Sequence, residues 1–158
     1  MSVKQPSELA EYLKAKKNVL LLTGELCDKV DWDGKSLLDY AADIAKKLNL
    51  PVAATANTAK GLKARAVQGA AKKYAAEIVD FMRWPEWRDK IMPEKPEVLV
   101  FIGYHRAASS GFISMVGKNA ETVSLNHIYE EEATYSLPDT AASLRQYQQN
   151  LEKLIQAL

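Results

Sequence analysis

Two apolar runs, Asn18-Val-Leu-Leu-Leu-Thr-Gly24 and Val98-Leu-Val-Phe-Ile-Gly103, are the strongest indication of the fold class of this chain. Each run is continuous rather than alternating, and each ends in a glycine. Strands of a parallel sheet have this composition, because helices cover both faces of such a sheet and bury every side chain. The two runs therefore predict strands inside a parallel sheet.

The segments around these runs alternate between helix and strand patterns. Residues 36–48 place leucine, isoleucine and alanine at helical spacing, and Asn49-Leu-Pro51 ends that helix before a second strand at 52–55. The remaining expected elements are a helix at 7–17 that Ser7 caps, a short helix or ordered loop at 58–68, a short strand or turn near Tyr74 and then a helix, a helix at 107–116, a strand at 122–125, a polar connection at 126–137 and a last helix that begins at Pro138-Asp139.

This alternation predicts the fold class. Strands that alternate with helices form a sheet between two helical layers. We therefore expect one α/β domain over residues 1–158, a three-layer Rossmann-like fold with a doubly wound parallel sheet. Its N-terminal helix lies within residues 1–17, and its C-terminal helix occupies residues 139–158.

The composition excludes several classes of protein. The 158 residues are 47% hydrophobic and 26% charged, which is typical of a globular chain. The 21 basic and 20 acidic residues are interspersed, which predicts no binding surface for nucleic acid or for an anionic membrane. Residues 1–9 carry no apolar signal segment, and the longest apolar runs are only strand-sized. The expected location is cytoplasmic.

The single cysteine, Cys27, limits the redox chemistry of the chain. It has no partner for an intrachain disulfide, and an iron–sulfur cluster normally takes four protein ligands. Any metal in redox chemistry would therefore belong to a partner. A plain small core or loop residue is favoured over a reactive thiol. A small hydrolase or transferase that uses Cys27 or His105 stays open as a third function.

A ligand site is expected beyond the carboxyl ends of the strands, where the strand order reverses. If the two apolar runs flank this point, the backbone at Gly24 and Gly103 can approach a phosphate, and Arg106 can add charge-assisted hydrogen bonds. Thr55 and Asn57 would form a third wall. Neither G-x-G-x-x-G nor a P-loop motif occurs, and a glycine that ends a buried strand usually only permits a turn. A flavin- or nicotinamide-nucleotide site and a plain turn both stay open.

Metal binding and acid–base catalysis have less support. His105 and His127 follow two strands, and the acidic residues 130–132 lie nearby, but the histidines lack a helical i, i+4 spacing. The acidic run is more simply a solvated loop. Asp31 and Asp33 lie in a turn, where such residues commonly bond the local backbone. We therefore predict no metal ligands and no catalytic residues.

An aromatic and basic cluster follows the helix that begins after Tyr74. Its members are Phe81, Arg83, Trp84, Trp87 and Arg88. Tryptophan and arginine are the residue types that most often dominate protein interfaces. Trp84, Trp87 and Arg88 are therefore candidate partner-interface residues; the alternative is that both tryptophans simply cover the sheet edge.

The order and spacing of several segments resemble one family, the epsilon subunits of archaeal carbon monoxide dehydrogenase/acetyl-CoA decarbonylase-synthase complexes. The resemblance runs from about Val19 to Leu158. Its carriers are the passage Ile44–Thr55, Pro85-Glu-Trp87, Phe101-Ile-Gly103 with Tyr104, and the stretch 128–137. The likeness rests on these segments together, because no single motif is specific.

This resemblance implies a doubly wound domain similar to the NAD/FAD-binding domain of deoxyhypusine synthase. It implies pairing with a large nickel–iron–sulfur alpha subunit in an α2ε2 assembly, no metal on the small subunit, and a role in stabilisation or in electron transfer to FAD. The chain departs from the family pattern at Ala56-Asn57, where a glycine is expected, and at Asn126, where an acid is expected. Both departures disfavour a nucleotide held by this subunit alone.

The sequence thus favours a non-catalytic accessory subunit without a tightly bound cofactor, and FAD is the cofactor that the resemblance suggests. The second hypothesis is a free-standing flavin- or nicotinamide-nucleotide-binding protein.

Overall fold

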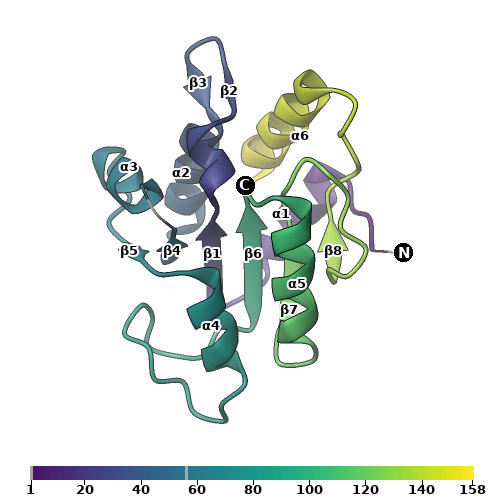
Figure 1. Ribbon diagram of the computed structural model, residues 1–158. Coiled ribbons are helices and arrows are strands. Elements are labelled where there is room, and N and C mark those ends of the chain that lie inside the picture. The colour runs from purple at the N-terminus through teal and green to yellow at the C-terminus, as the bar shows by residue number, and fades with distance from the viewer. Residues whose placement is uncertain (1, 56) are drawn as a thin grey trace.

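A parallel sheet of six strands is the centre of the computed structural model, which describes residues 2–55 and 57–158 (Figure 1). The strands in spatial order are β5 (Ala70–Lys72), β4 (Val52–Ala54), β1 (Val19–Thr23), β6 (Val98–Ile102), β7 (Glu121–Ser124) and β8 (Tyr135–Ser136). Every pairing in this sheet is parallel. The two predicted apolar runs are β1 and β6, and they lie side by side at the centre.

Two helical layers cover the sheet. Because side chains alternate along a strand, Leu21 and Val100 enter the core on one face, while Leu20 and Leu99 enter the core on the other. The first face packs against α1 (Pro6–Lys14), α2 (Leu37–Leu48), α3 (Thr58–Ala64) and α6 (Leu144–Ala157), and the second packs against α4 (Ala75–Met82) and α5 (Arg106–Val116). Complete burial of each leucine contributes about 1.5–3 kcal/mol. The predicted three-layer Rossmann-like fold is confirmed.

The strand order places a reversal of direction between β1 and β6. Counted in chain order, the six strands of the sheet lie as 3-2-1-4-5-6. The chain winds outward from β1 to β5, returns to the centre at β6, and winds outward again to β8. The carboxyl ends of β1 and β6 therefore flank the topological switch point, which is where such folds bind their ligands.

The terminal helices begin elsewhere than the sequence pattern predicts. Helix α1 begins at Pro6, and Ser7 is its second residue rather than its cap. Proline suits the first helical position because its missing N–H would be unpaired there anyway, and the Gln5 N–H donates to Glu8 Oε1 at 3.0 Å.

The C-terminal helix α6 begins at Leu144 and not at Pro138-Asp139. Its cap is Ser143, whose hydroxyl accepts a hydrogen bond from the Gln146 N–H at 3.2 Å. The sequence prediction was wrong because a proline followed by an acid is a common start signal, whereas the capping hydroxyl lies farther along the chain.

Two short strand pairings were missed in segments that the sequence pattern assigns to turns. The polar connection at 126–137 contains β8, which also forms a bridge to Val3. The segment after β1 contains a 3-10 turn, η1 (Glu25–Asp28), and a hairpin of β2 (Asp31–Trp32) and β3 (Lys35–Ser36). Strands of two residues carry no periodicity that a sequence pattern could reveal.

The hairpin turn has a local explanation. Asp33 and Gly34 connect its strands with φ angles of +38° and +93°. Asp-Gly is the preferred pair for a two-residue hairpin turn that needs positive φ at both positions. The Trp32 indole N–H donates to the Leu144 carbonyl at 3.0 Å, so the hairpin is attached to the start of α6.

Within residues 2–55 and 57–158, no helix has the length and apolar character that a membrane crossing requires. The likeness to the deoxyhypusine synthase domain stays a prediction. The assignment of residues 1–158 to one domain also stays a prediction, and the continuous sheet supports it.

Candidate functional site

The turns that follow β1 and β6 bond to each other at the switch point. The Gly24 N–H donates to the Ile102 carbonyl at 2.9 Å, and the Leu26 N–H donates to the Gly103 carbonyl at 2.9 Å. The Cys27 N–H then closes the turn on the Gly24 carbonyl at 3.1 Å. These bonds occupy backbone groups at the place where a bound phosphate would need free N–H donors.

Close packing explains why glycine stands at both predicted positions. A Cβ atom on Gly24 would lie 2.4 Å from the Gly103 carbonyl oxygen. A Cβ atom on Gly103 would lie 2.4 Å from Cys27 Sγ, and Gly103 also has a φ of +81° that disfavours any side chain. The turn interpretation accounts for both glycines without a ligand. Phosphate contact at Gly24 and Gly103 stays a prediction.

The hydroxyl of Thr55, which belongs to the predicted third wall of the ligand site, is already hydrogen-bonded. Thr55 Oγ1 donates to the Thr23 carbonyl at 2.7 Å, and Thr58 Oγ1 donates to the Thr55 carbonyl at 2.6 Å. These bonds join the ends of β1 and β4 to the start of α3. Asn57 and Arg106 are exposed at the same edge. Of the five predicted nucleotide contacts, these two present exposed side chains.

Asn126, which stands where the family resemblance implies an acid, has a structural partner. Its side-chain oxygen accepts the Tyr104 N–H at 3.1 Å, and the residue is buried. The bond ties the end of β7 to the turn after β6. Ala56, which belongs to the other departure from the family pattern, lies outside the described residues.

Cys27 is a core residue rather than an exposed nucleophile. Its side chain is fully buried, and its thiol donates to the Ile102 carbonyl at 3.6 Å. Burial raises the pKa of the Cys27 thiol well above its usual range, and the negative charge of Asp28 raises it further. Because the thiolate is the reactive form, this environment suits packing and not nucleophilic chemistry.

The histidines and glutamates do not assemble a metal site. His105 Nε2 lies 3.1 Å from Glu25 Oε1 on the surface. Burial lowers the pKa of His127. Throughout the described part of the chain, no group of three or more His, Cys, Asp or Glu side chains is arranged to hold a metal ion.

Glu130 corrects the interpretation of residues 130–132 as a solvated loop. Its side chain is buried, with 2% of its surface exposed. It accepts hydrogen bonds from Ser110 Oγ at 2.7 Å and from Ser109 Oγ at 3.3 Å. The carboxylate therefore binds the loop before β8 to helix α5. The sequence gives no signal for this, because the serines lie twenty and more residues away.

The aromatic cluster at the end of α4 divides into a partly buried and an exposed part. The Trp87 indole N–H donates to the Met92 carbonyl at 2.9 Å, and its ring meets Phe81 edge-on at 6.3 Å. Trp84 is 52% exposed, and the Arg88 guanidinium lies 5.8 Å from the centre of its ring. A hollow of about 180 Å³ lies beside this pair, lined by Phe81, Trp84, Glu86 and Arg88.

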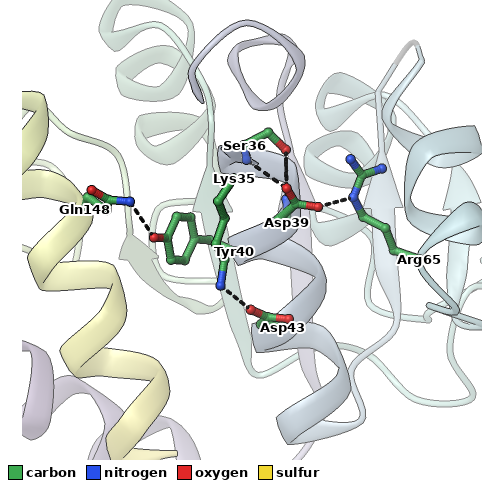
Figure 2. A network of polar contacts seen from close by, with 7 residues as sticks. All are labelled: Lys35, Ser36, Asp39, Tyr40, Asp43, Arg65 and Gln148. Carbon is green, nitrogen blue, oxygen red and sulfur yellow. Dashed lines mark hydrogen bonds and ion pairs between the residues drawn. The ribbon is translucent and has the colours of Figure 1, made fainter. Parts of the chain in front are cut away.

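Sequence reasoning missed a polar network on the outer face of α2, which Figure 2 shows. Asp39 lies 2.6 Å from Nε of Arg65, a residue at the end of α3, and it accepts the Ser36 N–H at 2.8 Å. Lys35 Nζ lies 3.0 Å from Asp43. The Arg65 and Ser36 hydrogen bonds hold the pKa of Asp39 below its usual range. The Ser36-x-x-Asp39 spacing was the available signal, since it matches a capping box.

Comparison with known proteins agrees with the resemblance seen in the sequence. The family described as CO dehydrogenase beta subunit/acetyl-CoA synthase epsilon subunit matches residues 1–155. The acetyl-CoA decarbonylase/synthase complex subunit epsilon of Methanothrix soehngenii is 23% identical over 149 residues, which cover 92% of this chain and 76% of the relative. Subunit epsilon 1 of the same kind of complex from Archaeoglobus fulgidus is 24% identical over 157 residues, covering 98% and 83%.

The family match over residues 1–155 includes helix α1, every strand of the sheet and most of helix α6. The chain belongs to the family of CO dehydrogenase beta subunits and acetyl-CoA synthase epsilon subunits.

Proposed function

We propose that this protein is a non-catalytic accessory subunit of an acetyl-CoA decarbonylase/synthase complex. It docks on the large nickel–iron–sulfur alpha subunit, in an α2ε2 assembly, and stabilises that subunit without a tightly bound cofactor of its own. Family membership over residues 1–155 supports the subunit role. The observation that carries the docking role is the exposed Trp84 beside Arg88.

In the isolated subunit, Trp84 exposes apolar surface to water that a partner could cover. Trp84 leaves half of a large apolar ring in contact with water, and the apolar hollow beside it extends the surface that a partner could cover. Arg88 lies within cation–π distance of the ring, so an arriving partner would meet an aromatic face and a cation together. Residues of these two types supply most of the binding free energy in protein interfaces.

We expect Trp84→Ala to weaken the complex with the alpha subunit by more than about 1 kcal/mol, which is roughly a fivefold rise in the dissociation constant. The loss follows from the apolar surface that the ring buries on docking. Isothermal titration calorimetry with the purified alpha subunit measures it, and native mass spectrometry gives the stoichiometry.

Met115→Ala is the matched control, because Met115 on α5 is 51% exposed and lies outside the cluster. Trp87→Ala is a poor probe, since Trp87 also holds the Met92 loop. An unchanged affinity in Trp84→Ala would remove the docking role from this surface. Wild-type protein that forms no complex at micromolar concentration would refute the subunit function.

The strand order favours a second candidate function, which is nucleotide binding or assistance in electron transfer to FAD. The switch point between β1 and β6 is the usual nucleotide site of this topology, and the exposed Asn57 and Arg106 lie at its edge. The hydrogen-bonded turns at Gly24 and Gly103 oppose it.

Titration with FAD or NAD decides this candidate. Binding at one hundred times the dissociation constant would add about 2.7 kcal/mol of stability and raise the melting temperature. We expect no rise at millimolar ligand for the isolated protein. A rise that disappears in Arg106→Ala would instead establish the switch point as a nucleotide site.

A further inference from the structure

One segment of the chain carries only positive charge. Residues 44–76 contain seven basic residues and no acidic residue. This departs from the expectation that charges of both signs are interspersed along the chain. The basic residues of this segment are Lys46, Lys47, Lys60, Lys63, Arg65, Lys72 and Lys73.

The fold gathers this segment at one edge of the sheet. It comprises the last turns of α2, strand β4, helix α3 and the edge strand β5, which lie together on the left of Figure 1. Helix α3 contacts α2, β4 and β5. Charges that are up to 27 residues apart in the sequence therefore share one surface, which we call the β5 edge.

Three acidic groups near the β5 edge are already paired. Asp39 lies 2.6 Å from Arg65, and Asp43 lies 3.0 Å from Lys35, as Figure 2 shows. Lys73 is paired with Asp89, which belongs to the loop after α4, at 2.8 Å. Each of these anions neutralises one cation. Five exposed lysines make no ion pair within residues 2–55 and 57–158: Lys46, Lys47, Lys60, Lys63 and Lys72.

These five lysines make the molecule electrically asymmetric. The whole chain has 21 basic and 20 acidic residues, so apart from these lysines 16 basic residues face 20 acidic ones. The five lysines thus carry a formal charge of +5, and the rest of the chain carries −4. Such a distribution orients a charged partner during its approach, which a net charge of +1 conceals.

The β5 edge is also hollowed. A depression of about 330 Å³ lies over the polar network, and its charged lining consists of Lys35, Lys46 and Arg65 with the paired carboxylates of Asp39 and Asp43. A second depression of about 160 Å³ is lined by Lys46, Asn49 and the turn at 66–69. Lys46 lines both, so the two depressions lie next to each other beside the free lysines.

We propose that the β5 edge is a docking surface for an acidic protein surface. Its charge complements carboxylate side chains, and its depressions give projecting side chains a place to enter. The proposal deepens the accessory-subunit function and rests on it, because the partner it implies is the alpha subunit of the complex. It assigns to this subunit a second contact, in addition to the surface around Trp84.

The chemistry of the β5 edge favours protein over nucleic acid. Residues 44–76 contain one aromatic residue, the exposed Tyr74, so the edge offers a single ring rather than a row of rings on which successive bases could stack. The one arginine of the segment, Arg65, is held by Asp39 and by the Gly61 carbonyl. Five unpaired lysines suit diffuse attraction to carboxylates.

The test reverses charge at the β5 edge and compares it with the same reversal elsewhere. The edge variant is K46E/K60E/K63E, and the control is K118E/R145E/K153E, whose basic side chains are also exposed and lie away from the Trp84 surface. Each replacement subtracts two charges, so both variants change the formal charge from +1 to −5. Circular dichroism confirms that both variants fold.

We expect the edge variant to associate with the alpha subunit at least about tenfold more slowly than wild type at low salt. We also expect its rate to lose most of the wild-type salt dependence, because the screened attraction is gone. The control should stay within about threefold of wild type. Equal losses in both variants, or no loss in the edge variant, would overturn the proposal.

Two further measurements separate this proposal from the subunit function. Carbodiimide joins a lysine to a carboxylate that it contacts, and mass spectrometry of the complex should find Lys46, Lys60 or Lys63 joined to the alpha subunit. If wild type forms no complex, the subunit function fails, and poly-L-glutamate becomes the probe. Binding that the edge variant loses supports an acidic protein partner; tighter binding of a single-stranded oligonucleotide overturns it.

Discussion

Gly103→Ala should lower the free energy of unfolding by about 3 kcal/mol or more, the largest effect expected of any substitution considered for this protein. Two causes add at this position. The φ of +81° is strained for alanine, and the new methyl group would lie 2.4 Å from Cys27 Sγ and 3.0 Å from the Cys27 nitrogen. Because Cys27 is fully buried, neither of these two atoms has space to move.

Urea unfolding of Gly103→Ala and Gly111→Ala measures this effect against a matched control. Gly111 lies within α5, and a Cβ atom there would meet nothing within 4 Å. Gly111→Ala should therefore raise the stability by about 0.5–1 kcal/mol, because alanine is the better helix former. A destabilisation below about 1 kcal/mol in Gly103→Ala would contradict the close packing at the switch point.

Cys27→Ala provides a second check, since it removes the atom that the new methyl group meets. In the Gly103→Ala background it should cost less than it does in wild type, because it also relieves the clash. The stability effects of substitutions at two residues in direct contact depart from additivity by about 0.5–3 kcal/mol. Strict additivity of the two substitutions would show that they do not share this contact.

Glu130→Ala should lower the free energy of unfolding by about 2–3 kcal/mol, the second largest effect. The substitution leaves Ser109 and Ser110 without the acceptor that lies 3.3 and 2.7 Å away, and it frees the loop that leads to β8. Hydrogen bonds to a charged group contribute more to stability than hydrogen bonds between neutral groups. When the acceptor is removed, a buried donor is left unpaired and keeps the full cost of its desolvation.

Glu131→Ala is the control for Glu130→Ala, because Glu131 is the adjacent residue and is exposed. Its effect should stay within about 0.5 kcal/mol. Chemical unfolding at neutral pH measures both variants, and Ser110→Ala in the Glu130→Ala background should add little. Equal stabilities of the two glutamate variants would contradict a buried structural role for Glu130.

Several elements were predictable because their signals are local. Strands β1 and β6 are continuous apolar runs in the sequence. Helix α2 shows apolar residues at helical spacing and has a capping serine at Ser36. The start of α6 and the strand β8 were not predictable in the same way. One depends on which hydroxyl caps a helix, and the other is two residues long and pairs with β7 and with Val3.

The candidate site divides along the same line. Trp84 and Arg88 were recognisable as interface types, and the structure leaves both exposed. The part played by Trp87 was hidden, because its bond to the Met92 carbonyl depends on how the loop after α4 folds back. Likewise, Gly24 and Gly103 were recognisable as turn residues, but their contact joins positions almost eighty residues apart.

The layer architecture follows from the sequence alone, because the apolar pattern of neighbouring residues indicates whether a strand or a helix face is buried. The contacts at the ends of the strands, in contrast, arise only when the chain is folded. Folding closes the two glycine turns on each other, buries Cys27 and Glu130, and brings the unpaired lysines of α2, α3 and β5 to one edge. These outcomes depend on distances between residues far apart in the chain, and such distances follow from the packing of the whole sheet rather than from any local pattern.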